Sequence, residues 1–323
     1  MVDFTWLRKS LHEYRLLRKE TSFWQSYNKG QQIRFYNFWK SQDIQDMWLY
    51  RFVKSHYDMA HEKEIVFVST LGRKDTFAKE RSHNLVFYTG ENLHDRFIPY
   101  SDNMMNDPRV SLSIGFDAFD NDRYIRFPLW ILYNFEPDSS DEQIKERVNQ
   151  LRYPDIRDKD RFCSMVASHD QRKIRTGITY QVDKIEPVCC PGKLLHNDDS
   201  LKDDFNDDKL AYLRHFQFNI CPENSNSFGY VTEKLFQAID AGCVPIYWGS
   251  NNMPEPGIIN PAAVLFFQPG KENESVLGQI KAMKSSADEW RKFASQPRLL
   301  PGAEDYVIDK FHELRAKMEG LCK

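Results

Sequence analysis

The stretch from residue 216 to residue 249 restricts the possible folds more than any other part of this 323-residue chain. It contains two short apolar segments typical of strands, Phe216–Cys221 and Val244–Trp248. A polar loop and about three turns of helix, ending near Gly242, lie between them. A strand–loop–helix–strand unit of this length is one βαβ crossover, so its two strands lie parallel in a sheet.

The loop of this unit has the composition of a binding site. In parallel sheets, ligands bind where strands end and helices begin, because free N–H groups at the helix start attract anions. Lys234 lies in the first helical turn, where a cation opposes the helix dipole and needs an anionic partner or solvent. A bound phosphate would supply that partner. The other polar residues of the loop and first turn are Glu223, Asn224, Ser225, Asn226, Ser227, Tyr230, Thr232 and Glu233.

The rest of the chain repeats the alternation of strands with helices or loops, without hairpin signals, and this favours parallel sheets covered on both faces. Two Rossmann-like domains facing across a cleft are the simplest architecture. We place an N-terminal domain at 1–150 and a C-terminal domain at 151–302, and we expect the helix in 303–323 to pack back on the first domain. Further strands are expected at 33–39, 64–69, 84–88, 110–116, 162–167, 187–190 and 263–267.

Composition excludes several classes of function. Hydrophobic content of 41%, charged content of 28% and a net charge of −3 are ordinary for a soluble globular protein and give no signal for nucleic acid. No apolar run approaches the roughly 20 residues of a membrane span, and the N-terminus does not resemble a signal peptide. The six cysteines show no CxxC spacing, which suits a reducing, cytoplasmic setting.

The first forty residues are locally basic, with Phe4, Leu7, Leu11 and Tyr14 at helical spacing. Such a helix could lie on anionic lipid as a peripheral contact with the cytoplasmic face of an inner membrane. The commoner arrangement, a helix packed on its own domain with a solvated basic face, is favoured by the pattern alone.

Motifs for several other chemistries are missing. The sequence has no GxGxxG or Walker-type glycine loop, no HExxH or Cys/His zinc spacing and no GxSxG elbow. The acidic run 198–208 holds six aspartates, but it lacks the alternation and glycine of a calcium loop, so a solvated loop is favoured over a cation site.

Two further places contribute chemistry. Glu91 follows a strand and a glycine in FYTGEN (87–92), where it could act as a general base, although an exposed loop glutamate is the commoner case for such spacing. Arg172, Lys173 and Arg175 lie between a strand and its helix and could face a phosphate, although basic residues there are more often solvated.

Together these residues resemble a known family. The stretch CPENSNSFGYVTEKLFQAIDAGCVPIYWG is similar to the signature of the α-1,3/4-fucosyltransferases, glycosyltransferase family 10. FYTGEN, IGFD, RYIRFP and FCSMVASHDQRKIR resemble motifs of its bacterial members, in the same order along the chain.

The resemblance implies an inverting enzyme of the two-domain GT-B type that uses GDP-β-L-fucose, held by the C-terminal domain. It implies that Glu91 is the catalytic base and that Arg175 and Lys234 contact the diphosphate. Asn224, Tyr230 and Glu233 would line the nucleotide and fucose pocket. Ser225, Thr232, Asn92 and Arg126 are further candidates for donor or acceptor contacts.

The family also suggests the substrates and conditions. The acceptor would be O3 or O4 of GlcNAc or Glc in a lactosamine-type glycan, giving Lewis-type structures of a surface polysaccharide. No metal or other cofactor is expected to be required, although Mn²⁺ or Mg²⁺ could stimulate. The oligomeric state is open.

The chain departs from the family pattern at Pro222, where phenylalanine is usual, and the SHDQRK stretch lacks an Asn-Pro pair. Two alternatives remain: a transferase of the same fold that uses another nucleotide sugar, and a non-catalytic glycan-binding protein.

Overall fold

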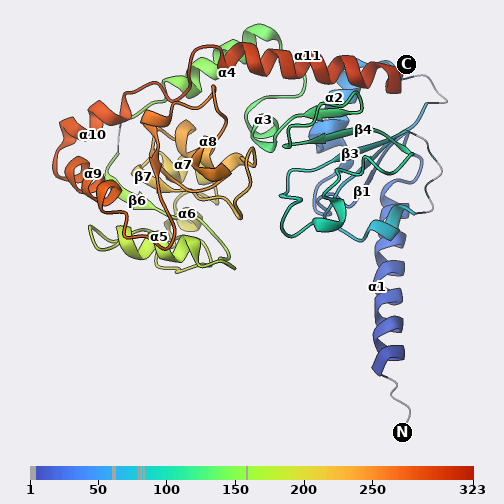
Figure 1. The fold of residues 1–323 in the computed structure, drawn as a ribbon, viewed down its shortest axis with the longest axis horizontal. Coiled ribbons are helices and arrows are strands. Elements are labelled where there is room, and N and C mark those ends of the chain that lie inside the picture. The colour runs from blue at the N-terminus through green and yellow to red at the C-terminus, as the bar shows by residue number, and fades with distance from the viewer. Residues whose placement is uncertain (1–4, 60–62, 79, 81, 83, 158) are drawn as a thin grey trace. The chain divides into compact units, whose positions relative to one another are not determined.

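The computed structural model describes residues 5–59, 63–78, 80, 82, 84–157 and 159–323, with side chains from residue 12 onward. The chain forms two compact units (Figure 1). Unit 1 comprises Met1–Phe127, Glu136–Asp138 and Asp309–Lys323, and unit 2 comprises Pro128–Phe135 and Ser139–Ile308. Each unit has its own parallel sheet, so the predicted mixed α/β fold with two parallel sheets is confirmed.

The sheet of unit 1 has five strands that follow one another in sequence order, and every pairing is parallel. Side chains of β2 and β3 are buried on both faces, as expected for central strands of a parallel sheet. Because the strands are parallel, their carboxyl ends share one edge. The strands are β1 (Ile33–Tyr36), β2 (Ile65–Val68), β3 (Leu85–Tyr88), β4 (Val110–Gly115) and β5 (Tyr124–Arg126).

Helices and short 3₁₀ turns surround this sheet. Phe311 of the last helix packs against Trp48 and Phe127, with ring centroids 5.8 and 5.6 Å away. Tyr57 adds a hydrogen bond from its hydroxyl to the carbonyl of Arg315. The elements are α1 (Thr5–Tyr27), η1 (Ile44–Asp46), α2 (Trp48–His56), η2 (Lys74–Phe77), η3 (Ile98–Tyr100) and α11 (Ala303–Cys322), of which residues 309 onward belong to unit 1.

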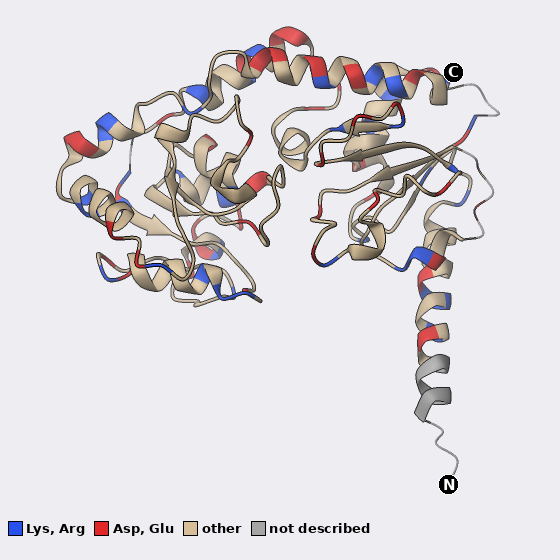
Figure 2. Cartoon of the chain, viewed as in Figure 1, with Lys and Arg blue, Asp and Glu red and all other residues tan. Residues whose placement is uncertain are grey.

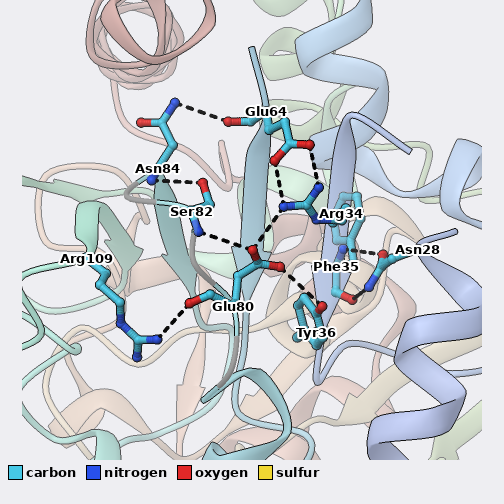
Figure 3. A network of polar contacts seen from close by, with 9 residues as sticks. All are labelled: Asn28, Arg34, Phe35, Tyr36, Glu64, Glu80, Ser82, Asn84 and Arg109. Carbon is cyan, nitrogen blue, oxygen red and sulfur yellow. Dashed lines mark hydrogen bonds and ion pairs between the residues drawn. The ribbon is translucent and has the colours of Figure 1, made fainter. Parts of the chain in front are cut away.

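A polar network closes the β1 side of the sheet (Figure 3). The Arg34 guanidinium pairs with Glu64 at 2.9 Å and with Glu80 at 3.1 Å. The hydrogen bond from Arg34 holds the pKa of Glu64 below its usual value. Asn28 hydrogen-bonds both the N–H and the carbonyl of Phe35, so the residue that follows α1 is joined to β1.

The N-terminal helix α1 packs on unit 1 through its C-terminal part. Trp24 is fully buried, and its ring lies 6.3 Å from that of Tyr36. Acidic and basic residues both lie along the described part of the helix (Figure 2), and Glu20 pairs with Lys40. Phe4 and the side chains of Leu7 and Leu11 lie outside the described residues. Among the described residues, no helix is long and apolar enough to cross a membrane.

The sheet of unit 2 has four strands in the order β6-β7-β8-β9, all parallel. They are β6 (Arg161–Ser164), β7 (Phe216–Ile220), β8 (Val244–Tyr247) and β9 (Leu265–Phe266). The strand predicted at 187–190 is reduced to a parallel bridge between Cys189 and Ser164, on the free side of β6. The connection after β6 therefore leads to Cys189 on one side of the sheet. The connection after β7 leads to β8 on the other side.

The predicted βαβ unit is present: α8 (Glu233–Asp240) joins β7 to β8. Gly242 follows with φ +74°, a conformation that glycine adopts without strain. The other helices of unit 2 are α3 (Leu129–Asn134), α4 (Asp141–Arg152), α5 (Ile174–Val182), α6 (Ser200–Asp203), α7 (Lys209–Leu213), α9 (Glu274–Ser285) and α10 (Ala287–Ala294); two 3₁₀ turns lie at η4 (Ser250–Asn252) and η5 (Pro261–Ala263).

The division between the units does not fall at residue 150. α3 and α4 group with unit 2 because both pack on α8. Trp130 of α3 stacks on Phe236, with centroids 4.2 Å apart and ring planes 4° from parallel. Arg147 of α4 pairs with Asp240 at 2.7 Å.

Candidate active site

A cavity of about 490 Å³ opens in unit 2 at the carboxyl ends of β6 and β7. This is the point at which the strand order reverses, because one connection leads toward Cys189 and the other toward β8. Loops that leave a parallel sheet in opposite directions leave a crevice between them, where ligands of α/β proteins bind. The cavity is lined by Arg175, Asn224, Glu233 and Lys234, four of the residues predicted for the donor site.

Arg175 is buried at the start of α5, and its guanidinium faces neutral acceptors. It donates to the carbonyl of His169 and to Oδ1 of Asn224, each at 2.5 Å. Burial lowers the pKa of Arg175 below its ordinary value. Arg172 and Lys173, the other cations predicted near a phosphate, are exposed and do not line the cavity.

The start of α5 is capped from within the chain. Both carboxylate oxygens of Asp170 accept backbone N–H groups, from Ile174 at 3.0 Å and from Thr176 at 2.8 Å. These two donors are therefore already satisfied within the chain.

Glu223 organises the start of α8. Its carboxylate is fully buried and accepts the N–H of Thr232 at 2.8 Å and the Thr232 hydroxyl at 2.6 Å. It also accepts from the Lys234 ammonium at 3.3 Å and from the Tyr247 hydroxyl at 3.5 Å. Sequence reasoning placed Glu223 in the polar loop but gave it no role in the site. Its partners lie 9 to 24 residues away, and no local motif identifies them.

Lys234 already has anionic partners in the protein. Its ammonium lies 3.3 Å from Glu223 and 3.4 Å from Glu233, and the Thr232 hydroxyl lies 2.8 Å away. Burial acts to lower the pKa of Lys234, but the two carboxylates outweigh it and raise that pKa above its ordinary value. The chain itself thus supplies anionic partners for this cation, and a contact between Lys234 and a phosphate stays a prediction.

A second lysine, Lys209, lines the cavity from the first residue of α7. Its ammonium donates to the side-chain oxygen of Gln237 at 2.7 Å. Burial lowers the pKa of Lys209. Sequence reasoning missed this residue, because it follows an acidic run that marks a solvated loop.

The remaining predicted donor residues are buried or lie at the rim. Ser225, Tyr230 and Thr232 are buried and do not line the cavity, whereas Asn224 is exposed and reaches Arg175. The Glu233 carboxylate does line it. Burial acts to raise the pKa of Glu233, but Lys234 and Lys209 outweigh it and hold that pKa below its ordinary value.

Gly249, at the end of β8, leaves the room that Glu223 needs. Its φ is +146°, and a Cβ built there would lie 2.6 Å from Cγ of Glu223. Beyond it, Ser250, Asn251 and Asn252 all have positive φ. Such residues cost roughly 1 kcal/mol each and persist only where contacts hold them. Here the Ser250 hydroxyl accepts the N–H of Gly229, which ties this turn to the loop after β7.

The acidic run has structural partners. Asp198 accepts from Arg161 and from the Tyr212 hydroxyl, both at 2.7 Å, and Asp208 caps α7 by accepting the N–H of Ala211. Among the described residues, no group of three or more His, Cys, Asp or Glu side chains could hold a metal ion.

In unit 1, Glu91 lies in the loop after β3, at the carboxyl edge of the sheet. The hydroxyl of buried Thr89 accepts the Glu91 N–H at 3.0 Å, and buried Asn92 accepts the N–H of His94 at 2.9 Å through Oδ1. His94 in turn contacts Asp117, which follows β4, at 2.7 Å. Arg126 ends β5 at the same edge.

Parallel sheets with a crevice at the strand-order reversal, lined by cations, are typical of α/β proteins that bind anionic ligands. The N-terminal domain model of α-(1,3)-fucosyltransferase FucT matches residues 33–133, and the C-terminal model of glycosyltransferase family 10 (fucosyltransferase) matches residues 156–299. The chain belongs to glycosyltransferase family 10.

Known proteins of the family resemble the chain over different lengths. It is 27% identical over 281 residues to the α-(1,3)-fucosyltransferase FucT of Helicobacter pylori. This alignment covers 76% of this chain and 55% of that protein. The chain thus spans little more than half of that relative. An α-(1,4)-fucosyltransferase of Arabidopsis thaliana is 46% identical over 43 residues, which are 13% of this chain and 11% of that one.

Crystal structures of α1,3-fucosyltransferase share the fold. One aligns with a TM-score of 0.60 at 23% identity, covering 88% of this chain and 89% of that one. A second, determined with GDP-fucose, aligns with a TM-score of 0.57 at the same identity and coverage.

Proposed function

We propose that the chain transfers L-fucose from GDP-β-L-fucose to O3 or O4 of GlcNAc or Glc in a lactosamine-type glycan, with inversion at the anomeric carbon. The observation that supports it most is the cavity at the strand-order reversal, lined by Arg175, Glu233 and Lys234 in a chain of glycosyltransferase family 10. A nucleoside diphosphate brings two phosphates that need cations, and Arg175 and Lys234 supply positive charge.

The reaction is a single displacement. As the acceptor hydroxyl attacks the anomeric carbon of fucose, Glu91 removes its proton and the bond from that carbon to the β-phosphate oxygen breaks. GDP leaves with the bonding electron pair. Arg175 and Lys234 stabilise the negative charge that develops on the leaving phosphate. Because the nucleophile enters opposite the leaving group, the configuration inverts.

The assigned base is tested with Glu91→Gln, which keeps the shape of the side chain and removes its basicity. We expect transfer to fall by roughly 10²- to 10⁴-fold. GDP binding, measured by calorimetry, should stay unchanged because Glu91 lies in unit 1 and the cavity in unit 2. Transfer at the unmodified rate would contradict the assignment of Glu91 as base.

The two alternatives have separate outcomes. Thermal stabilisation by UDP or CMP but not by GDP would identify a transferase for another nucleotide sugar. Stabilisation by a glycan without release of GDP from GDP-fucose, over an array of acceptors, would favour a glycan-binding protein.

The finer proposals concern product and setting. Lewis-type structures on a surface polysaccharide are the proposed product, and linkage analysis of the array products would test this. We propose a cytoplasmic protein with a peripheral contact of α1 on an anionic inner membrane, to be tested by flotation with anionic vesicles. We also propose that no metal is required, so EDTA should leave transfer measurable, while Mn²⁺ or Mg²⁺ could raise it.

A further inference from the structure

The cations of the cavity differ in what already surrounds them. Lys234 lies within 3.4 Å of two carboxylates, Glu223 and Glu233. Arg175 and Lys209 donate to neutral oxygen atoms only: to the His169 carbonyl and Asn224 for the arginine, and to Gln237 for the lysine. Among the described residues, neither Arg175 nor Lys209 has a carboxylate within 4.0 Å.

A cation that is at least partly buried and touches no carboxylate is costly unless a ligand pairs with it. Carboxylates act on these two cations only at longer range: Asp170, Glu223 and Glu233 on Arg175, and Glu233 on Lys209. Burial lowers the pKa of both Arg175 and Lys209, whereas the pKa of Lys234 is raised by its carboxylates. We therefore expect an anion that enters the cavity to be bound most strongly by Arg175 and Lys209. Lys193 also lines the cavity, but it is exposed, so solvent screens its charge.

Lys209 is also held in place for such a contact. It begins α7, whose N-terminus is capped by Asp208, and the hydrogen bond to Gln237 of α8 fixes its ammonium. α7 and α8 pack together, so the lysine is supported from two helices. A fixed ammonium loses little side-chain entropy when a ligand binds, which favours affinity.

We propose that Lys209 is a further donor-binding residue, whose ammonium contacts the diphosphate together with Arg175 and Lys234. The inference rests on the proposed function, because it takes a nucleoside diphosphate as the anion. It concerns the phosphates and predicts no effect on recognition of the base.

The experiment measures GDP and guanosine binding by calorimetry for the unmodified protein, Lys209→Met and a control, Lys202→Met. Methionine keeps the length of the side chain and removes its charge. We expect Lys209→Met to weaken GDP binding by roughly 10- to 100-fold, the range for a charge-assisted hydrogen bond. Guanosine affinity should stay within about twofold, since it has no phosphate. Lys202 is exposed on α6 and does not line the cavity, so its variant should match the unmodified protein.

A thermal melt of each variant separates lost binding from lost folding. If Lys209→Met does not fold, Lys209→Gln takes its place with the same expectation, and Lys209→Arg, which keeps the charge, should retain most of the GDP affinity.

Failure of this inference and failure of the proposed function give different results. Equal GDP affinity in Lys209→Met and the unmodified protein would overturn the role of Lys209 and leave GDP as a ligand. If the unmodified protein binds UDP instead of GDP, the proposed donor is wrong, and the same comparison with UDP decides the role of Lys209. Binding of neither nucleoside diphosphate would overturn both.

Discussion

Glu223→Gln is the substitution that most directly tests the internal ion network of the cavity. Glutamine has the shape of glutamate, so its oxygen can still accept the Thr232 N–H. Its amide group, however, places N–H donors toward the Lys234 ammonium, which also only donates. Lys234 then keeps Glu233 at 3.4 Å as its carboxylate partner.

The expected loss in free energy of unfolding follows from how deeply Glu223 and Lys234 are buried. Removing one partner of a buried ion pair costs about 3–5 kcal/mol. Here Glu223 is fully buried, but the Lys234 side chain is 17% exposed and retains Glu233, so we expect about 2–3 kcal/mol. Little relaxation is available, because Gly249 lies directly against the Glu223 side chain.

The loss in free energy of unfolding caused by Glu223→Gln should also depend on pH. The pKa of Lys234 is raised above 10.5 in the folded protein, so the stabilisation is complete below that value and is lost as pH rises through the higher folded pKa. The difference between the unmodified protein and Glu223→Gln should thus be constant from pH 7 to about pH 9 and shrink at strongly alkaline pH.

Urea denaturation followed by circular dichroism measures this free energy of unfolding. Glu186→Gln is the matched control, because Glu186 pairs with Lys284 at 2.8 Å on the surface, where an ion pair contributes about 0–1 kcal/mol. If the two variants differ by less than about 0.5 kcal/mol, the reasoning from the buried pair is refuted.

Two other substitutions test features of unit 2. Gly249→Ala introduces a Cβ 2.6 Å from Cγ of Glu223 at a φ of +146°, so we expect a loss of at least about 2 kcal/mol in urea denaturation; a smaller loss would mean that the turn adjusts easily. Asp198→Asn tests a carboxylate whose burial would raise its pKa, but whose hydrogen bonds, led by that from Ser200, lower it to about 2. Its stabilisation is present above the ordinary aspartate pKa of 3.8 and is lost as pH falls through about 2, so the variant should be about 2 kcal/mol less stable at pH 7 and equal only below pH 2. A constant difference across that range would contradict this.

Periodicity and turn signals in the sequence located most elements of the fold. The βαβ unit at 216–249 and the last helix are both present within a few residues of their predicted bounds. These elements are defined by contacts close in sequence, which a pattern of apolar residues reflects.

Features that depend on distant contacts were not predictable in this way. The grouping of α3 and α4 with unit 2 depends on Trp130 and Arg147 meeting α8 about one hundred residues later. The segment 187–190 has the composition of a strand, yet it forms a single bridge, from Cys189 to Ser164 of β6. The resemblance identified Arg175 and Lys234 as site residues, but their different partners became evident only in the structure.

The two sheets differ in a way that bears on how specificity can change. The order of the sheet in unit 2 reverses at β6 and β7, so its crevice is a product of topology and persists whatever side chains line it. The five strands of unit 1 run in sequence order, so within the described part of the chain that edge has no crevice of this origin. Whatever binds there must be recognised by the loops that follow the strands, which tolerate substitution and insertion. Substitutions in those loops can therefore change recognition at the edge of unit 1 without altering the crevice of unit 2.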